Sequence, residues 1–150
     1  MKIILFATLL SVATIFSACK KDKNTTPPIE QNELPKGQYR LTEMHQADST
    51  GIDSAGVKFP KSTMILSFDN AAKTANLTGK AESMTINGGY KVGGSNALTD
   101  PVFTSDRTVA TENDLAVLDM LENGESFKNE GDDVVIETED KGYLTFSMQK

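Results

Sequence analysis

The sequence has 150 residues, a formal net charge of −6 and a single cysteine. This length suits one domain, and the acidic excess argues against a nucleic-acid partner, because phosphates need a basic footprint on the protein. One cysteine cannot build a disulfide framework, so the hydrophobic core must hold the fold alone.

The chain begins like an export signal. Lys2 supplies a positive charge, and residues 3–16 are mostly apolar. This stretch is shorter and more polar than the roughly 20 residues of a membrane-spanning helix, so it indicates a signal peptide. Residues 16–19 (FSAC) resemble the bacterial lipobox, with a bulky apolar residue and two small residues before the cysteine. The resemblance implies that residues 1–18 are a lipoprotein signal peptide and that Cys19 is lipidated on its sulfur and new amino group.

The alternative for Cys19 is an ordinary thiol at the end of a signal sequence. An exported chain with one unpaired cysteine would then carry a free reactive thiol, and lipidation removes that oddity. Two or more acyl chains give stable attachment to a membrane, at about 0.8 kcal/mol per buried methylene.

Residues 19–36 have the polar, proline-bearing composition of a flexible linker, which here would carry the lipid. Lys20, Lys21 and Lys23 either contact anionic lipids, at about 1 kcal/mol each, or are solvated linker charges. Lys20 is not the aspartate associated with inner-membrane retention, which favours the outer membrane. The stretch also lacks the acidic cluster associated with surface export in Bacteroidetes. We therefore expect a periplasm-facing protein, with the cell surface as the alternative.

Residues 37–150 have the pattern of a β-rich domain. Alternating apolar and polar residues predict about seven strands, at residues 37–44, 62–69, 73–78, 82–92, 125–129, 132–138 and 142–148. Residues 97–104, which contain Pro101, form either a further short strand or an irregular crossover. The polar residues 45–61 predict a long loop. Gly88 and Gly89 indicate either a bulge or a close approach of another backbone, and residues 139–142 indicate a hairpin turn.

One helix is predicted near residues 112–123. Thr111 and Asp114 form a capping-box pattern at its start, and Asn123 with Gly124 ends it. Leu115, Leu118 and Leu121 recur at helical spacing, which we interpret as a core-facing stripe rather than a partner groove. The predicted fold is mostly β (α+β): a curved antiparallel sheet or small barrel whose open end is plugged by this helix.

Several segments resemble the META/HslJ-like family of bacterial envelope proteins. They are residues 37–41 (GQYRL), 66–69 (LSFD), 87–90 (NGGY), Thr108, 112–121, 131–136 (GDDVVI) and 142–146 (GYLTF). The resemblance covers residues 37–148, although residues 83–86 lack the Cys-Asn pair common in that family. It implies a non-enzymatic role in envelope maintenance or stress response, through binding of another envelope protein or glycan.

The alternative is a lipocalin-like lipoprotein domain that binds a small hydrophobic ligand inside its barrel. The two differ in the volume of the interior. A META-like interior should be filled by bulky inward residues, whereas a ligand binder must leave a cavity of about 300 Å³ or more. The expected inward residues are Tyr39, Phe68, Ile86, Leu118 and Phe146.

Reactive residue types are few. His45, the only histidine, could form a weak metal cluster with Glu43 and Asp48, or could be a solvated loop residue. Asp132 and Asp133 could pair as acid and base, but a turn before a strand explains them better.

Asp48, Ser49, Thr50, Asp53 and Ser54 could hold a cation, but their spacing lacks the calcium-loop pattern. The Gly88-Gly89 and Gly93-Gly94 pairs precede no phosphate-loop helix. We therefore expect no catalytic, metal or cofactor residues, and membrane attachment at Cys19 as the one assigned site. An enzyme remains the third possibility.

Overall fold

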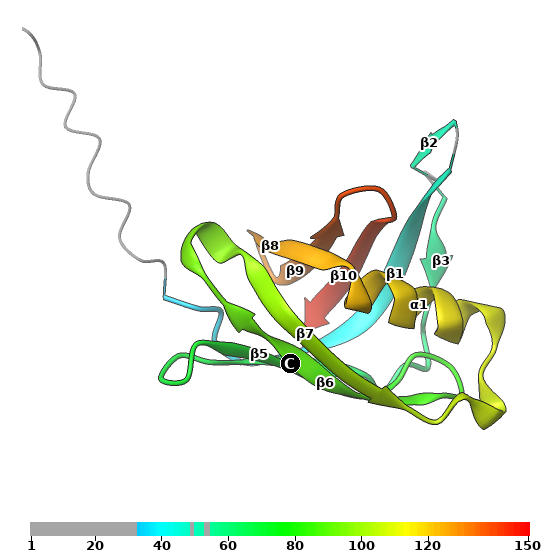
Figure 1. The fold of residues 1–150 in the computed structure, drawn as a ribbon, viewed down its shortest axis with the longest axis horizontal. Coiled ribbons are helices and arrows are strands. Elements are labelled where there is room, and N and C mark those ends of the chain that lie inside the picture. The colour runs from blue at the N-terminus through cyan, green and yellow to red at the C-terminus, as the bar shows by residue number, and fades with distance from the viewer. Residues whose placement is uncertain (1–32, 49, 53–54) are drawn as a thin grey trace, which may run out of the picture.

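The computed structural model describes residues 33–48, 50–52 and 55–150. This part of the chain forms one strongly curved antiparallel sheet and one α-helix (Figure 1), which confirms the predicted mostly β fold. The strands are β1 (Gln38–Asp48), β2 (Gly51–Ile52), β3 (Val57–Lys58), β4 (Ile65–Asp69), β5 (Thr74–Lys80), β6 (Thr85–Val92), β7 (Leu98–Ser105), β8 (Gly124–Glu130), β9 (Asp133–Thr138) and β10 (Gly142–Met148). The helix is α1 (Glu112–Glu122), and two short 3-10 helices are η1 (Gly94–Asn96) and η2 (Arg107–Val109).

The main sheet has the strand order β7-β6-β5-β4-β1-β10-β9-β8. Strands that follow one another in sequence pair as hairpins on each side, and β1 joins β10 at the centre. Leu41 lies opposite Phe146 and Met44 opposite Leu144, so the apolar side chains of both strands face the same interior. The short strands β2 and β3 pair with the second half of β1.

The sheet curls until its two edges approach each other. One bridge joins Ala97, just before β7, to Ser126 on β8. Farther along, α1 lies against β7 and β10 and covers the opening between the edges (Figure 1). The predicted arrangement of a helix over an open part of a curved sheet is therefore present.

The helix is fixed by its capping box and by the residues it buries. The hydroxyl of Thr111 accepts from the Asp114 backbone N–H, and the Asp114 side chain accepts from the Thr111 N–H. Asp114, Val117, Leu118 and Leu121 form the stripe that faces the core, in the i, i+3, i+4, i+7 pattern of one helix face, and Met120 beside them is buried as well. Leu115, predicted to face the core, is instead 44% exposed, so this part of the prediction is wrong.

The interior is filled by side chains from every strand of the main sheet and from α1; β7 contributes Leu98, and its Phe103 packs against the core. All five residues predicted to point inward lie in this core or, for Phe68, pack against it. The ring of Phe68 contacts Tyr39 edge-on and lies 4.8 Å from Phe127 between ring centres. The largest fully buried side chains are Phe59, Phe127, Phe146, Leu41, Met44, Met64, Leu66, Leu77, Met84, Ile86, Met120 and Leu121.

Tyr90 attaches the end of α1 to this core. Its hydroxyl donates to the backbone carbonyl of Leu121, and its ring lies edge-on to Phe103. Burial raises the pKa of the Tyr90 phenol far above its ordinary value, so the group stays a donor at any physiological pH.

The predicted loop at residues 45–61 is wrong in its first part. β1 continues to Asp48, and β2 and β3 lie within the remainder. Residues 97–104 prove to be mostly strand, since β7 covers all but the first of them, and Pro101 is tolerated because β7 is an edge strand. Gly88 and Gly89 mark a close backbone approach: a Cβ on either would lie 2.1 Å from a carbonyl oxygen of a neighbouring strand. A register shift does follow them, between Gly89 and Lys91, but its extra residue lies on β7.

The buried part of the domain begins earlier in sequence than residue 37. Leu34 and Pro35 are buried, although their composition placed them in the linker. The backbone N–H of Leu34 donates to Asn70 Oδ1 at 2.9 Å, and Asn70 Nδ2 donates back to the Leu34 carbonyl at 3.3 Å. This reciprocal pair fixes the start of the described chain beside the turn between β4 and β5.

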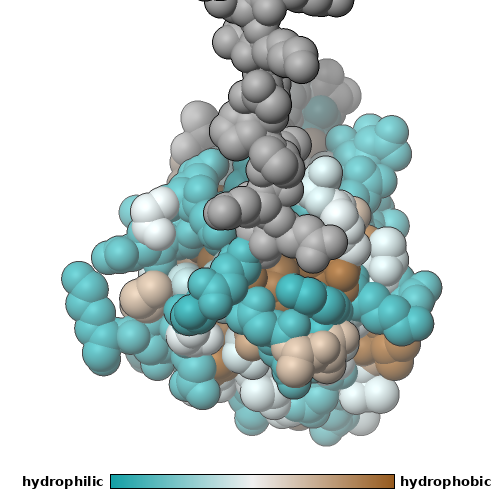
Figure 2. Space-filling model, turned by 90° about the vertical axis from the view of Figure 1, so that its left-hand side faces the viewer, coloured by the Kyte–Doolittle hydropathy of each residue, from teal (hydrophilic) through white to brown (hydrophobic). Residues whose placement is uncertain are grey.

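The visible surface at this end of the molecule is largely hydrophilic, with small hydrophobic patches between the polar residues (Figure 2). Among the described residues, none of the helices has the length and apolar character needed to cross a membrane.

Candidate functional site

Several predicted site residues lie outside the described part of the chain. They are Cys19, the lysines Lys20, Lys21 and Lys23, and the loop residues Ser49, Asp53 and Ser54. Lipid attachment at Cys19 therefore stays a prediction.

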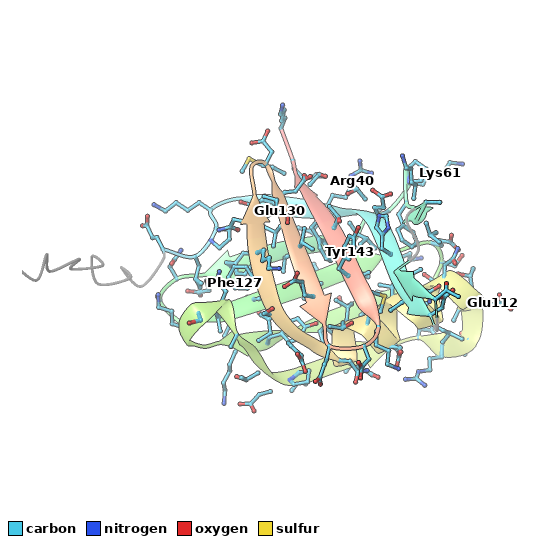
Figure 3. The ribbon with its side chains drawn as sticks, turned by 90° about the horizontal axis from the view of Figure 1, so that it is seen from above. Arg40, Lys61, Glu112, Phe127, Glu130 and Tyr143 are labelled. Atoms are coloured by element: carbon cyan, nitrogen blue, oxygen red, sulfur yellow. The ribbon has the colours of Figure 1, made fainter. Side chains whose placement is uncertain are left out.

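His45 is not the solvated loop residue that its polar surroundings in sequence indicated. It lies on β1 opposite Tyr143 of β10 and is only 7% exposed. The two rings are stacked, with centres 4.5 Å apart and planes 18° apart. Figure 3 shows Tyr143 on β10, near the middle of the outer face of the sheet. His45 Nε2 lies 3.2 Å from Glu43 Oε1, and a Cβ on Gly56 would lie 2.7 Å from the same nitrogen.

This geometry packs His45 into the sheet instead of offering it to a metal. Asp48, the third predicted ligand, closes the turn after β1: its Oδ1 accepts from the backbone N–H groups of Thr50 and Gly51 and from the Thr50 hydroxyl. The Thr50 hydroxyl and these N–H groups lower the pKa of the Asp48 carboxyl. In the described ranges, no three His, Cys, Asp or Glu side chains converge as a metal site would require.

Asp132 and Asp133 lie in the hairpin between β8 and β9. Asp132 is exposed and faces Lys150, at 3.9 Å from its Nζ, while Asp133 starts β9. Gly131 before them has φ of +68°, a turn conformation that suits glycine. Their turn role therefore accounts for both residues.

Asp114 forms the most completely bonded polar cluster of the described structure. Its carboxylate has no exposed surface and accepts backbone N–H groups of Glu82 at 2.9 Å, Ser83 at 3.1 Å and Met84 at 3.1 Å, in addition to that of Thr111. Burial alone would raise the pKa of this carboxyl, but the backbone N–H groups together outweigh it and lower the pKa.

The Asp114 cluster joins the start of α1 to the segment between β5 and β6. Glu82 completes it from the other side, because its carboxylate accepts from the Thr111 hydroxyl at 2.7 Å and from Asn113 Nδ2 at 2.9 Å. Each carboxylate oxygen of Asp114 and Glu82 accepts at least one hydrogen bond from the protein itself. The cluster is thus structural. The capping-box pattern in the sequence predicted the bonds between Thr111 and Asp114, but not those to the segment between β5 and β6.

A shallow depression on the outer face of the sheet is a better candidate for binding. It has a volume of about 290 Å³ and is lined by Thr85 and Asn87 of β6, Thr104 and Ser105 of β7, and Asp106. We call these five residues the polar depression. It lies where β6 begins and β7 ends, at the opposite end of these strands from the β6–β7 connection (Figure 1).

Hydrogen bonds on the protein side hold the lining groups of the polar depression in place. The Thr78 hydroxyl donates to Asn87 Oδ1 at 2.6 Å, and the Thr104 hydroxyl donates to the Asn87 carbonyl at 3.3 Å. Asp106 Oδ1 accepts from both the hydroxyl and the backbone N–H of Thr108, and these bonds lower the pKa of the Asp106 carboxyl.

Sequence reasoning missed the polar depression. Thr85 and Asn87 share one face of β6, and Thr104 shares the same face through its pairing with Asn87. The alternation in each strand could indicate a row of polar residues on the outer face. Which residues of the two rows lie side by side depends on the register of β6 and β7, and the bulge after Gly89 sets that register.

Comparison with known proteins yields one solved structure. No protein-family model matches the sequence, and none of the curated proteins matches it. The structure is similar to the crystal structure of a DUF4847 family protein from Bacteroides vulgatus ATCC 8482, with a TM-score of 0.53 and 16% sequence identity. The likeness covers 77% of this chain and 94% of that one. At this identity the comparison establishes a shared fold.

Proposed function

We propose that this chain is a lipid-anchored lipoprotein of the bacterial outer membrane, whose META/HslJ-like domain binds another envelope component without catalysing a reaction. The observation that carries the proposal is the lipobox-like sequence FSAC at residues 16–19, ahead of a polar stretch and a folded β domain. Lipid on Cys19 would hold the domain at the membrane, in our expectation on the periplasmic side.

The described start of the chain supports this arrangement. Leu34 is held by Asn70 at one end of the domain, and 14 residues separate Cys19 from Leu34 in the sequence. A chain of that length has a root-mean-square reach of roughly 20 Å if it is flexible, enough to place the domain in water beside the headgroups. The hydrophilic surface seen at this end agrees with such a position (Figure 2).

The organisation of the domain supports a binding role without an internal ligand. The segments that resemble the META/HslJ-like family fall in order on or beside β1, β4, β6, η2, α1, β9 and β10. The interior is occupied by large side chains such as Phe127, Phe146 and Met64. This packing favours a filled domain that binds through its surface over the lipocalin-like alternative.

Metabolic labelling with an alkyne fatty acid tests the anchor. In a bacterial host, the wild-type chain should incorporate the label and sediment with the outer membrane, whereas Cys19→Ser should do neither. Lys20→Ser is the matched control, because it changes the neighbouring residue and keeps the cysteine. A Cys19→Ser protein that is still labelled, or a wild-type protein that is not, would remove the basis of the proposal.

Crosslinking in the native membrane, followed by purification of the lipidated protein, tests the binding role. The expected product contains a protein or glycan of the envelope. Recovery of lipid alone would count against a binding role while leaving the anchor intact.

A further inference from the structure

We infer that the polar depression binds a neutral saccharide, an inference that rests on the proposed function because it names the class of envelope component that the domain contacts. The residues are Thr85, Asn87, Thr104, Ser105 and Asp106. The argument rests on how the protein orients these groups, on charge, and on size.

Asn87, Thr104 and Asp106 each make a hydrogen bond within the protein and keep a further hydrogen-bonding position that no described residue uses. Thr78 occupies Oδ1 of Asn87, so within the described chain the amide Nδ2 remains to donate. Thr104 donates its hydroxyl proton to a backbone carbonyl, so its oxygen remains to accept. Asp106 is held through Oδ1 by Thr108, which leaves acceptor capacity on the carboxylate. The result is a fixed arrangement of one donor group and two acceptors.

A sugar hydroxyl both donates and accepts, so adjacent hydroxyls on one ring match a fixed set of donors and acceptors. Little conformational freedom of the protein is lost on binding, because the hydrogen bonds on the protein side already hold the side chains. Thr85 and Ser105 add hydroxyls whose rotation can adapt to either role.

Charge restricts the class of saccharide. Thr108 and, to a smaller extent, the nearby Lys80 hold the pKa of the Asp106 carboxyl low, so this group is anionic at neutral pH. Asp106 lines the polar depression and repels acidic sugars, whereas Lys80 is not among the lining residues. The other four lining residues are uncharged. A neutral ring therefore fits better than a uronic acid or a phosphate.

Size and lining set the expected affinity. A volume of about 290 Å³ lies at the small end of ligand sites, which suits a single sugar ring of a longer chain. The five lining residues include no aromatic ring on which a sugar could stack. We expect dissociation constants in the millimolar range for a short oligosaccharide, strengthened on a polymeric target by many anchored copies.

Saturation-transfer difference NMR suits this range and uses the full lipidated chain in detergent micelles. The probes are two neutral oligosaccharides, chitotetraose for a cell-wall type of backbone and maltotetraose for a storage type, and one anionic oligosaccharide, tetragalacturonate. We expect saturation transfer to at least one neutral probe, and the responding probe identifies the type of source.

Two variants and two matched controls locate the site. Asn87→Ala and Thr104→Val each remove one group and should weaken binding roughly five- to tenfold, the effect of one lost hydrogen bond. Asn76→Ala changes an exposed asparagine on β5, and Thr99→Val changes a threonine on β7 whose hydroxyl also donates to a backbone carbonyl. Both controls should bind as the wild type does.

Three results would overturn the inference: no transfer to either neutral probe at about 20 mM, some tenfold above the expected dissociation constant; equal binding by all four variants; or a response to tetragalacturonate alone. Lipidation of Cys19 is measured separately. A failure here therefore leaves the proposed anchor standing. If fatty-acid labelling fails, the same full chain is measured without lipid, because Cys19 is not among the residues that line the polar depression.

Discussion

Replacing Asp114 by asparagine should destabilise the domain by about 3 kcal/mol at neutral pH. In the wild type, Oδ1 accepts from Glu82 and Oδ2 accepts from Met84 and Thr111, all through backbone N–H groups. Asparagine keeps one acceptor oxygen and turns an NH₂ group towards the other donors. Two buried N–H groups then lose their partner, at about 1–3 kcal/mol each.

Urea denaturation followed by circular dichroism measures this change directly, and the melting temperature should fall by roughly 10 °C. Asp119→Asn is the matched control on the same helix. Asp119 is about half exposed and pairs with Lys141 at the surface, so its loss should change the free energy of unfolding by less than about 1 kcal/mol. An Asp114→Asn protein within 1 kcal/mol of the wild type would refute the idea that these N–H groups depend on the charge.

The pH dependence follows from the lowered pKa of the Asp114 carboxyl. A carboxyl whose pKa is lower in the folded state stabilises the protein fully above its unfolded pKa, here the ordinary value of 3.8. That stabilisation is lost as the pH falls below 3.8 through the folded-state value. The difference in free energy of unfolding between wild type and Asp114→Asn should therefore be constant near neutral pH and shrink in acid.

Two further substitutions test packing and backbone geometry, each read out by the free energy of unfolding. Leu34→Ala should cost about 2–3 kcal/mol because Leu34 is 5% exposed, whereas Glu33→Ala beside it should be nearly neutral; equal effects would place Leu34 outside the core. Gly142→Ala should cost about 3 kcal/mol or more, because φ is +110° and the added Cβ would lie 1.8 Å from the carbonyl oxygen of His45. Gly94→Ala meets nothing within 4 Å and should be tolerated, so comparable losses at both glycines would contradict the stated cause.

Local chemistry was enough to predict the helix and the last hairpin. The capping box at Thr111 and the stop at Asn123 bound α1 to within one residue of the prediction. Strong alternation with a polar turn between the strands did the same for β9 and β10. In these segments the signal lies within a dozen neighbouring residues, so no distant contact is needed to read it.

The predicted loop after residue 44 failed for the opposite reason. Residues 45–48 (HQAD) show no alternation. Their extended conformation comes from pairing, of His45 and Gln46 with β10 and of Ala47 and Asp48 with β2. Likewise, the leucine spacing in α1 allowed two neighbouring stripes. The stripe that contains Asp114 faces the core because its carboxylate accepts from backbone N–H groups in the segment before β6. The local sequence does not encode this contact.

The polar depression could not be predicted from the sequence for a related reason. It forms where β6 and β7 bring Asn87 opposite Thr104, and that register depends on a bulge near Gly89. Sequence indicated an irregularity at Gly88 and Gly89, but the extra residue of the bulge lies on β7. A register shifted by one residue would have turned Thr104 to the other face.

The pairing of β1 with β10 also bears on when the domain can fold. Thr42 and Thr145, which are hydrogen-bonded across this central pair, are 103 residues apart. The entropy of closing so long a loop must be overcome before the contact stabilises the chain, so we expect folding on the order of milliseconds to seconds. A chain that has emerged only as far as β7 can form the hairpins of one half, but nothing yet joins them to the other. For a protein exported as we propose, that late closure would keep the chain in a threadable state through most of its passage across the membrane.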